Sequence, residues 1–202
     1  MDAAVLIPVK DFRQAKARLA GVLSANDRIR LARWTAVRVV AAAAPLPVFV
    51  ACDDDAVAEW AESVGATVLW RPGMGLNAAV EDGIDTLARA GIDNAIVAHS
   101  DLPIPSPLPN LVMSGGAVLV PDNRRDGTNV IAVPTNAGFQ PSYGIGSFRR
   151  HLAQVMQLDL PVRVLPDPRL ALDIDTPRDL AHPLIARSLP TWLPTNPANL
   201  QS

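Results

Sequence analysis

The sequence has little from which a disulfide framework, a zinc site or a nucleic-acid surface can be built. Its 202 residues include one cysteine, Cys52, and three scattered histidines, so an internal disulfide is excluded and no Cys/His cluster has zinc-binding spacing. The formal net charge is −2, whereas nucleic-acid and membrane surfaces usually require a basic face. We therefore expect a small-molecule partner, with no nucleic acid and no membrane.

Long hydrophobic runs and targeting signals are also missing. No window approaches the ~20 apolar residues of a membrane span, and the apolar stretch near the start is too short for a secretion signal, so we expect a cytoplasmic protein. Because 49% of the residues are hydrophobic, the chain can bury one core. We predict a single domain over residues 1–185. The proline-containing segment 186–202 is predicted to be an irregular tail.

Short apolar runs alternate with helical periodicity through the first half of the chain. The predicted strands lie at 3–9, 47–52, 66–70 and 94–100, and the predicted helices at 24–44, 54–65 and 77–91. The second half is less regular, with strands at 116–121, 128–134 and 162–166 and a helix at 147–157. This alternation predicts an α/β, Rossmann-like three-layer fold with a mostly parallel sheet, whose ligands bind beyond the carboxyl ends of the strands.

Acidic residues occur at two predicted strand ends. Asp101 directly follows the apolar run 94–100, and Pro103 comes two residues later. A strand-end aspartate usually caps a helix or binds a cation, and Asp101 alone does not decide between them. Asp173 and Asp175 lie two residues apart in an extended segment, so their side chains point to the same side. Together these three carboxylates predict a Mg²⁺ site.

Basic side chains follow the first predicted strand. Lys10, Lys16 and Arg18 lie within nine residues, and cations in this place suit a triphosphate. A solvated helix face with basic residues is the alternative, because such residues are common on surface helices. No Walker loop and no GxGxxG pattern is present, so neither a P-loop nor a dinucleotide fingerprint applies.

Two further loops combine glycines with hydrogen-bonding side chains. In the first, two glycines and an amide either approach a nucleotide or form a turn with a helix cap; these residues are Gly73, Gly75 and Asn77. In the second region, two hydroxyls and a glycine lie at a strand start and a helix start, where an anion can bind. These residues are Thr128, Gly144 and Ser147. For Ser147, simple capping of the helix is the alternative.

Six motifs in order resemble the CofC/FbiD family of guanylyltransferases. They are PVK…AKxRL at 8–19, GLN at 75–77, SDLP at 100–103, DGTN at 126–129, PxxGxxSF at 141–148 and LDIDTPxDL at 172–180. The resemblance extends from residue 3 to about residue 181. One departure is YGIGS at 143–147, where the family more commonly has FGxDS, so the acceptor pocket is expected to differ.

The resemblance implies a nucleotide-diphospho-sugar-transferase (GT-A) fold and the transfer of GMP from GTP to a phosphorylated three-carbon acid, with release of pyrophosphate, in coenzyme F-420 biosynthesis. The implied acceptor is phosphoenolpyruvate, 2-phospho-L-lactate or 3-phospho-D-glycerate. By position, Asp101 and Asp173 match the family's metal ligands, and Asp175 is a further candidate ligand. The acceptor-binding residues match Thr128, Gly144 and Ser147, and the phosphate-facing residues match Lys10, Lys16 and Arg18.

Two other functions stay open. One is a related nucleotidyltransferase that makes molybdopterin or sugar nucleotides, although such enzymes usually begin with a glycine-rich LAGGxSxRMG loop that this chain lacks. The other is a non-catalytic nucleotide-binding regulator in which the acidic residues are helix caps. The sequence does not fix the oligomeric state, and a homodimer is one of the options.

Overall fold

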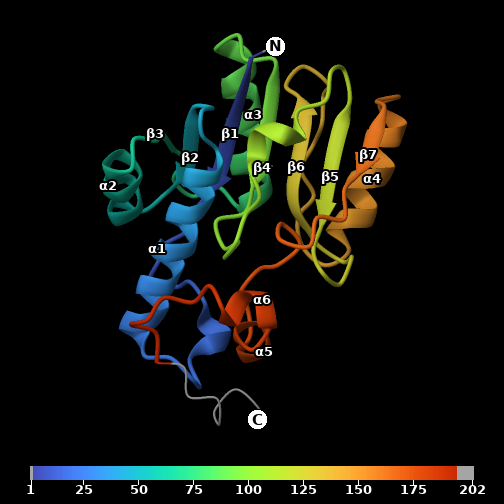
Figure 1. The fold of residues 1–202 in the computed structure, drawn as a ribbon. Coiled ribbons are helices and arrows are strands. Elements are labelled where there is room, and N and C mark those ends of the chain that lie inside the picture. The colour runs from blue at the N-terminus through green and yellow to red at the C-terminus, as the bar shows by residue number, and fades with distance from the viewer. Residues whose placement is uncertain (1, 195–202) are drawn as a thin grey trace.

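The computed structural model describes residues 2–194, and within them seven strands form one sheet in the order β3-β2-β1-β4-β6-β5-β7 (Figure 1). The strands are β1 (Ala3–Pro8), β2 (Val48–Cys52), β3 (Thr67–Trp70), β4 (Asn94–Ala98), β5 (Ala117–Pro121), β6 (Thr128–Pro134) and β7 (Val162–Val164). Only the pairs that β6 makes with β4 and β5 are antiparallel. The predicted mostly parallel sheet is confirmed.

Helices cover both faces of the sheet, which confirms the three layers. The helices are α1 (Ala25–Ala42), α2 (Asp55–Ser63), α3 (Leu76–Arg89), α4 (Ser147–Gln157), α5 (Pro177–Leu180) and α6 (Pro183–Ala186), with 3₁₀ segments η1 (Ala17–Leu19) and η2 (Leu108–Leu111). Because neighbouring strand residues point to opposite faces, Val5 and Ile7 join the core beneath α1 and α2, whereas Leu6 joins the core beneath α3 and α4.

Local sequence signals account for how α1, α2 and α3 are placed. Ser24 caps α1 by accepting a hydrogen bond from the backbone N–H of Asp27 at 3.1 Å. Asp54 caps α2 through the Val57 N–H. Gly83 lets α3 approach β1 closely, because a Cβ there would lie 2.6 Å from a Leu6 methyl carbon. These signals set the first three βα units.

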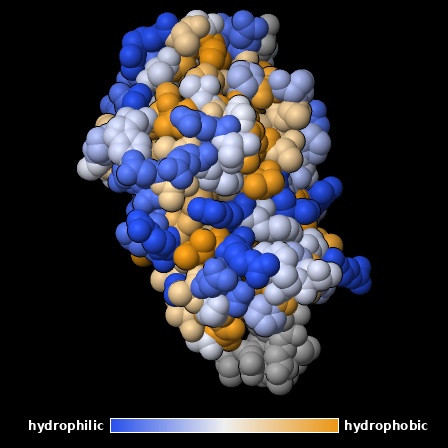
Figure 2. All heavy atoms as spheres, turned by 90° about the vertical axis from the view of Figure 1, so that its left-hand side faces the viewer, coloured by the Kyte–Doolittle hydropathy of each residue, from blue (hydrophilic) through white to orange (hydrophobic). Residues whose placement is uncertain are grey.

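The parallel strands bring their following loops to one edge of the sheet. At this edge α5 and α6 lie beside the start of α1 (Figure 1), and a third apolar cluster joins them through Leu19, Leu31, Leu180 and Ile185. On the face that carries α2, hydrophilic and hydrophobic side chains are interspersed (Figure 2). None of the described helices has both the length and the apolar character needed to cross a membrane.

The segment after the predicted domain boundary is partly described. Residues 187–194 form no helix or strand, but Leu193 is only 4% exposed and packs in the third apolar cluster. This part of the predicted tail therefore contributes to the packing around α5 and α6. The rest of the predicted tail, residues 195–202, lies outside the described residues.

Candidate active site

Three carboxylates meet at the loop edge of the sheet. Asp101 follows β4, and Asp173 and Asp175 come from the extended segment before α5. One carboxylate oxygen from each residue lies within 4.8 Å of the others. Strand β4 ends at Ala98, so Asp101 lies in the turn beyond the strand, and it caps no described helix, since the next helical segment begins at Leu108. The structure thus brings together the three residues that the sequence predicts as metal ligands.

Lys16 lies among these carboxylates. Its backbone is left-handed, with φ of 58°, just before η1, and its side chain is only 5% exposed. The Lys16 Nζ atom lies 3.1 Å from Asp101 Oδ2 and 3.8 Å from Asp175 Oδ1. The more exposed Arg18 guanidinium reaches the other oxygen of Asp175 at 3.7 Å. Two of the cations predicted to face phosphates therefore contact the predicted metal ligands in this structure.

The carboxylate cluster is not fully compensated by these cations. Burial, together with the negative charges of Asp101 and Asp175, raises the pKa of Asp173 to about 7. Burial and the charge of Asp101 also raise the pKa of Asp175. Burial by itself would raise the pKa of Asp101, but the positive charges of Lys16 and His99 outweigh burial and lower that pKa. The cluster can therefore accept further positive charge.

A hard divalent cation fits this donor set. Three carboxylates within reach of one point are the oxygen ligands that Mg²⁺ prefers, with water and substrate oxygens completing its shell. Asp101 Oδ1 is buried and has no hydrogen-bond partner among residues 2–194, and leaving such an oxygen unpaired is costly. The residues present thus fit a magnesium site held by Asp101, Asp173 and Asp175.

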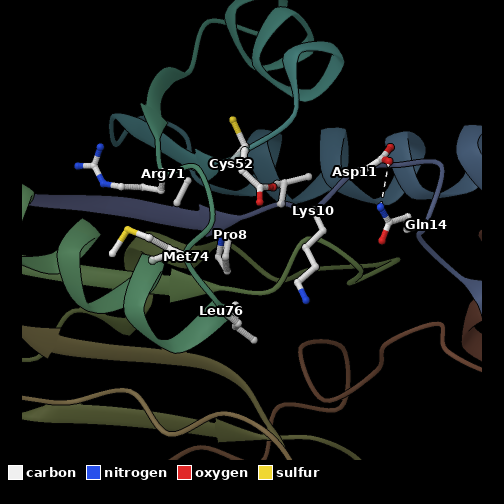
Figure 3. Close-up of a pocket in the computed structure, with 12 residues that line it drawn as sticks. Pro8, Lys10, Asp11, Gln14, Cys52, Arg71, Met74 and Leu76 are labelled. Carbon is white, nitrogen blue, oxygen red and sulfur yellow. Dashed lines mark hydrogen bonds between the residues drawn. The ribbon is translucent and has the colours of Figure 1, made fainter.

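A cleft opens on the β1 side of the carboxylates. It consists of two adjoining cavities of about 230 and 210 Å³ that share Pro8, Val9, Lys10 and Leu76 in their walls, and we call it the Lys10 cleft. The second cavity also reaches Lys16, Asp101 and Asp175. Figure 3 shows the first cavity, with the Lys10 side chain extending from the loop after β1 and Arg71 and Asp11 at opposite ends.

The predicted glycine loop borders this cleft through its neighbouring residues. Met74 and Leu76 line the cavity, while Gly73 has a left-handed backbone, with φ of 70°, and Gly75 precedes α3 as its N-cap. Asn77 is not the cap. Its side-chain oxygen instead accepts a hydrogen bond from the Tyr143 backbone N–H at 2.7 Å. Asn77 therefore ties the start of α3 to the loop before α4.

A third, larger cavity of about 650 Å³ lies on the other side of the carboxylates, and we call it the α5 pocket. Its walls come from the turn between β5 and β6, the loop before α4, and the segment around α5. Asp173, Asp175 and Gly144 line it. Because Asp175 also lines the Lys10 cleft, the carboxylate cluster stands at the junction of the two cavities.

Thr128 and Ser147 lie behind the wall of the α5 pocket. Each is 2% exposed. The Ser147 hydroxyl oxygen accepts a hydrogen bond from the Thr128 backbone N–H at 3.1 Å, and the Thr128 hydroxyl lies 2.9 Å from Nδ1 of His151. The alternative that Ser147 caps α4 is wrong, because Gly146 is the N-cap. In this structure the two hydroxyls hold the turn before β6 against the loop before α4.

His151 completes this buried network in its neutral form. Burial lowers its pKa to about 4. Its Nε2 atom accepts a hydrogen bond from the Ser142 backbone N–H at 2.9 Å, so Nε2 carries no proton and Nδ1 donates to the Thr128 hydroxyl. The sequence placed His151 after the PxxGxxSF motif but gave no sign of this role.

The loop before α4 follows its unusual sequence. Gly144 and Gly146 have positive φ angles of 116° and 73°, a region that residues with a Cβ rarely adopt. The Arg150 guanidinium donates to the carbonyl oxygens of Ser142 and Ile145. A Cβ at position 146 would also lie 3.3 Å from this guanidinium. Glycine in place of the family's aspartate therefore fits the local backbone.

The comparisons with known proteins agree on one family. Residues 3–188 match the family described as guanylyl transferase CofC like. The phosphoenolpyruvate guanylyltransferase of Rubrobacter xylanophilus is 36% identical over 191 residues, which are 90% of this chain and 93% of that protein. The 2-phospho-L-lactate guanylyltransferase of Archaeoglobus fulgidus is 32% identical over 179 residues, which are 87% of this chain and 80% of that protein.

Solved structures support the same fold. A protein from Desulfovibrio desulfuricans G20 assigned as a nucleotide-diphospho-sugar transferase has a TM-score of 0.75 at 17% identity, covering 99% of this chain and 94% of its own. A nucleotidyl transferase from Methanothermobacter thermautotrophicus has a TM-score of 0.66 at 14% identity, with coverage of 93% and 99%. The fold is thus of the nucleotide-diphospho-sugar-transferase type. The chain is an enzyme of the nucleotidyltransferase type, and it belongs to the family of CofC-like guanylyl transferases.

Proposed function

We propose that this protein transfers GMP from GTP to the phosphate of a three-carbon phospho-acid and releases pyrophosphate. The observation that carries the proposal is the placement of three carboxylates and Lys16 at the junction of two cavities. A reaction between two anionic substrates needs a cationic centre between them, and a divalent cation held by these carboxylates would place one between the two cavities. The names of the relatives support guanylyl transfer in particular.

The Lys10 cleft is the proposed nucleotide site. It lies beyond the carboxyl ends of β1 and β2, the usual place for a nucleotide in an open α/β sheet, and Lys10 offers its ammonium group to the triphosphate. Met74 and Leu76 supply an apolar surface beside it. Gly73, Gly75 and Asn77 shape the loop that carries this surface. The α5 pocket is then the acceptor site, because it faces the same carboxylates from the other side.

The chemistry needs no nucleophilic side chain. An oxygen of the acceptor phosphate forms a bond to the α-phosphorus of GTP, and the bond from that phosphorus to the β-phosphate oxygen breaks, so that pyrophosphate leaves with the electron pair. Mg²⁺ held by Asp101, Asp173 and Asp175 would supply the positive charge that lets the two anions approach. Lys10, Lys16 and Arg18 add fixed positive charges around the same point.

The acceptor we favour is phosphoenolpyruvate, with 2-phospho-L-lactate and 3-phospho-D-glycerate as the other candidates. The relatives' names support the first two. The pathway we propose is coenzyme F-420 biosynthesis, on the basis of family membership, and with it a cytoplasmic location. Gly144 lines the proposed acceptor site directly, whereas Thr128 and Ser147 shape its wall from behind.

The test is a product assay with each acid separately. Purified protein, MgCl₂ and GTP are mixed with one of the three acids, and the guanosine diphosphate-linked acid is identified by mass spectrometry while pyrophosphate is measured in parallel. We expect both products from at least one acid with GTP, and little product when ATP or CTP replaces GTP. The Asp101→Asn variant should lose most turnover and remain folded. Equal use of any nucleotide, or no product from any acid, would contradict the proposal.

A further inference from the structure

Asn129 is a buried polar residue that the reaction as described does not use. It is the last residue of the DGTN motif and is only 4% exposed. It lies near the start of β6, and β6 pairs with β4, the strand that leads to Asp101. A buried amide is tolerated where it makes hydrogen bonds to the segments around it. The contacts of Asn129 therefore indicate which segments it holds in place.

A β-bulge in β6 sets the direction of the Asn129 side chain. The pairing of β6 with β5 shifts register between residues 128 and 130, so Asn129 is the extra residue of the bulge. In a regular strand Asn129 would face the same side as Ile131, which packs beneath α3 and α4. Its side chain instead contacts Leu170, whose own side chain packs beneath α1 and α2. The bulge thus turns the amide toward the segment that leads to Asp173.

Asn129 is bonded to both arms of the carboxylate cluster. Its backbone carbonyl oxygen accepts a hydrogen bond at 3.0 Å from the N–H of His99, two residues before Asp101. Its side-chain nitrogen Nδ2 donates at 3.0 Å to the carbonyl oxygen of Leu170, three residues before Asp173. Because a carbonyl oxygen can only accept, the nitrogen of the amide and not its oxygen must face Leu170. One residue therefore holds the start of each segment that carries the proposed metal ligands.

The bond to Leu170 has no substitute within residues 2–194. Leu170 is fully buried, and its carbonyl oxygen accepts no hydrogen bond there other than that of Asn129. A buried acceptor without a donor is costly, so the segment should shift toward water when the amide is removed. Such a shift would displace Asp173 and Asp175 from Asp101. Mg²⁺ demands a near-ideal octahedral shell, so a small displacement of its ligands weakens its binding.

We propose that Asn129 is a positioning residue, which sets the separation between Asp101 and the pair Asp173 and Asp175 and thereby the affinity of the site for a divalent cation. This inference rests on the metal site of the proposed function. Asparagine suits the position because its short side chain carries an N–H donor. Aspartate has the same shape but, when ionised, can only accept hydrogen bonds, and leucine has a similar shape without any donor.

Binding of Mn²⁺ measures the proposed effect without any turnover. Mn²⁺ takes the same oxygen ligands as Mg²⁺, and electron paramagnetic resonance of the unbound ion during a titration gives its Kd. Asn129→Leu keeps the approximate shape and removes the donor. It should raise the Mn²⁺ Kd about tenfold, the lower end of the range for residues that orient metal ligands. Asn129→Ala avoids any overpacking by leucine and should raise the Kd at least as much.

Thr135→Val is the matched control. Thr135 directly follows β6 and is 8% exposed, and its hydroxyl donates to the carbonyl oxygen of Ile92 at 2.6 Å. This is the same kind of bond, but it lies at the other end of β6, where Pro134 pairs with the start of β4. Asn129→Leu and Thr135→Val should both lower the urea midpoint in metal-free buffer. Only the Asn129 variants should weaken Mn²⁺ binding, and Thr135→Val should change the Kd less than about twofold.

The failure of this inference can be told apart from the failure of the proposed function. If the wild type makes no product from any phospho-acid, the proposed function fails, and the Mn²⁺ titration still tests Asn129. Where product forms, the MgCl₂ concentration for half-maximal rate should rise about tenfold in Asn129→Leu, in step with the Kd. An unchanged Kd in both Asn129 variants, an equal rise in Thr135→Val, or no Mn²⁺ binding to the wild type overturns the inference.

Discussion

Replacing Asp173 by asparagine should make the metal-free protein more stable and the enzyme inactive. Burial and two neighbouring carboxylates raise the Asp173 pKa from 3.8 to about 7, so the ionised form is disfavoured in the folded protein. About three pKa units correspond to about 4 kcal/mol, and because the side chain is partly exposed, solvent screening reduces the expected gain for Asp173→Asn to about 2–3 kcal/mol at pH 8. Asparagine keeps the shape of the Asp173 side chain and removes its negative charge.

The gain should depend on pH in a defined direction. A carboxyl whose pKa is higher in the folded state binds its proton more tightly there, so the wild type loses stability as the pH rises from about 4 to about 7. The Asp173→Asn variant lacks this loss. The difference in the free energy of unfolding between variant and wild type should therefore be near zero below pH 4 and largest above pH 7.

Urea unfolding in EDTA-treated buffer, repeated across this pH range, measures the difference. Added MgCl₂ should reverse the order, because an ion that binds only the folded wild type stabilises it by an amount that grows with the logarithm of the ion concentration above its Kd. Asp85 is exposed on α3, so Asp85→Asn is the control for the change in net charge. This variant should show neither the gain in stability without metal nor the reversal with MgCl₂. A metal-free Asp173→Asn protein that is less stable than the wild type at pH 8 would refute the reasoning.

Three other substitutions test the surroundings of the site. Lys16→Met should lower the free energy of unfolding by about 2–3 kcal/mol in metal-free buffer, because it leaves partly buried carboxylates without their cation. An unchanged free energy of unfolding in urea would contradict the contact. Ser147→Ala should cost about 1–3 kcal/mol, since the buried Thr128 N–H loses its acceptor, and an unchanged thermal midpoint would argue against that bond. Asn77→Ala should raise the acceptor KM more than the GTP KM, because the Asn77 side chain holds the Tyr143 loop rather than the Lys10 cleft; the opposite order in steady-state kinetics would favour a direct nucleotide contact.

The central site could be predicted from sequence because it depends on few, strong rules. The apolar runs fixed the strands, and parallel strands bring their following loops to one edge, so Asp101 and the pair Asp173 and Asp175 had to approach one another. Alternation along an extended segment was enough to place that pair on one side. Helical spacing likewise predicted a helix from residue 24, and the structure has Ser24 as the N-cap of α1.

The remaining contacts depend on which side chains meet in three dimensions. Lys16 has a left-handed backbone and contacts the carboxylates, and the sequence pattern of basic residues near a strand end gave no sign of this contact. The hydroxyls of Thr128 and Ser147 looked available for an anion, but β6 and α4 pack so that they bond to each other's segment.

An oxygen-labelling measurement tests the central claim most directly. A phospho-acid that the enzyme accepts is prepared with ¹⁸O in the three non-bridging oxygens of its phosphate, and the reaction with unlabelled GTP is followed by mass spectrometry. If an acceptor oxygen attacks the α-phosphorus of GTP, the guanosine diphosphate-linked acid retains all three labelled oxygens and the pyrophosphate has none. Labelled oxygen in the pyrophosphate, or loss of a labelled oxygen from the product, would contradict the proposed transfer of GMP.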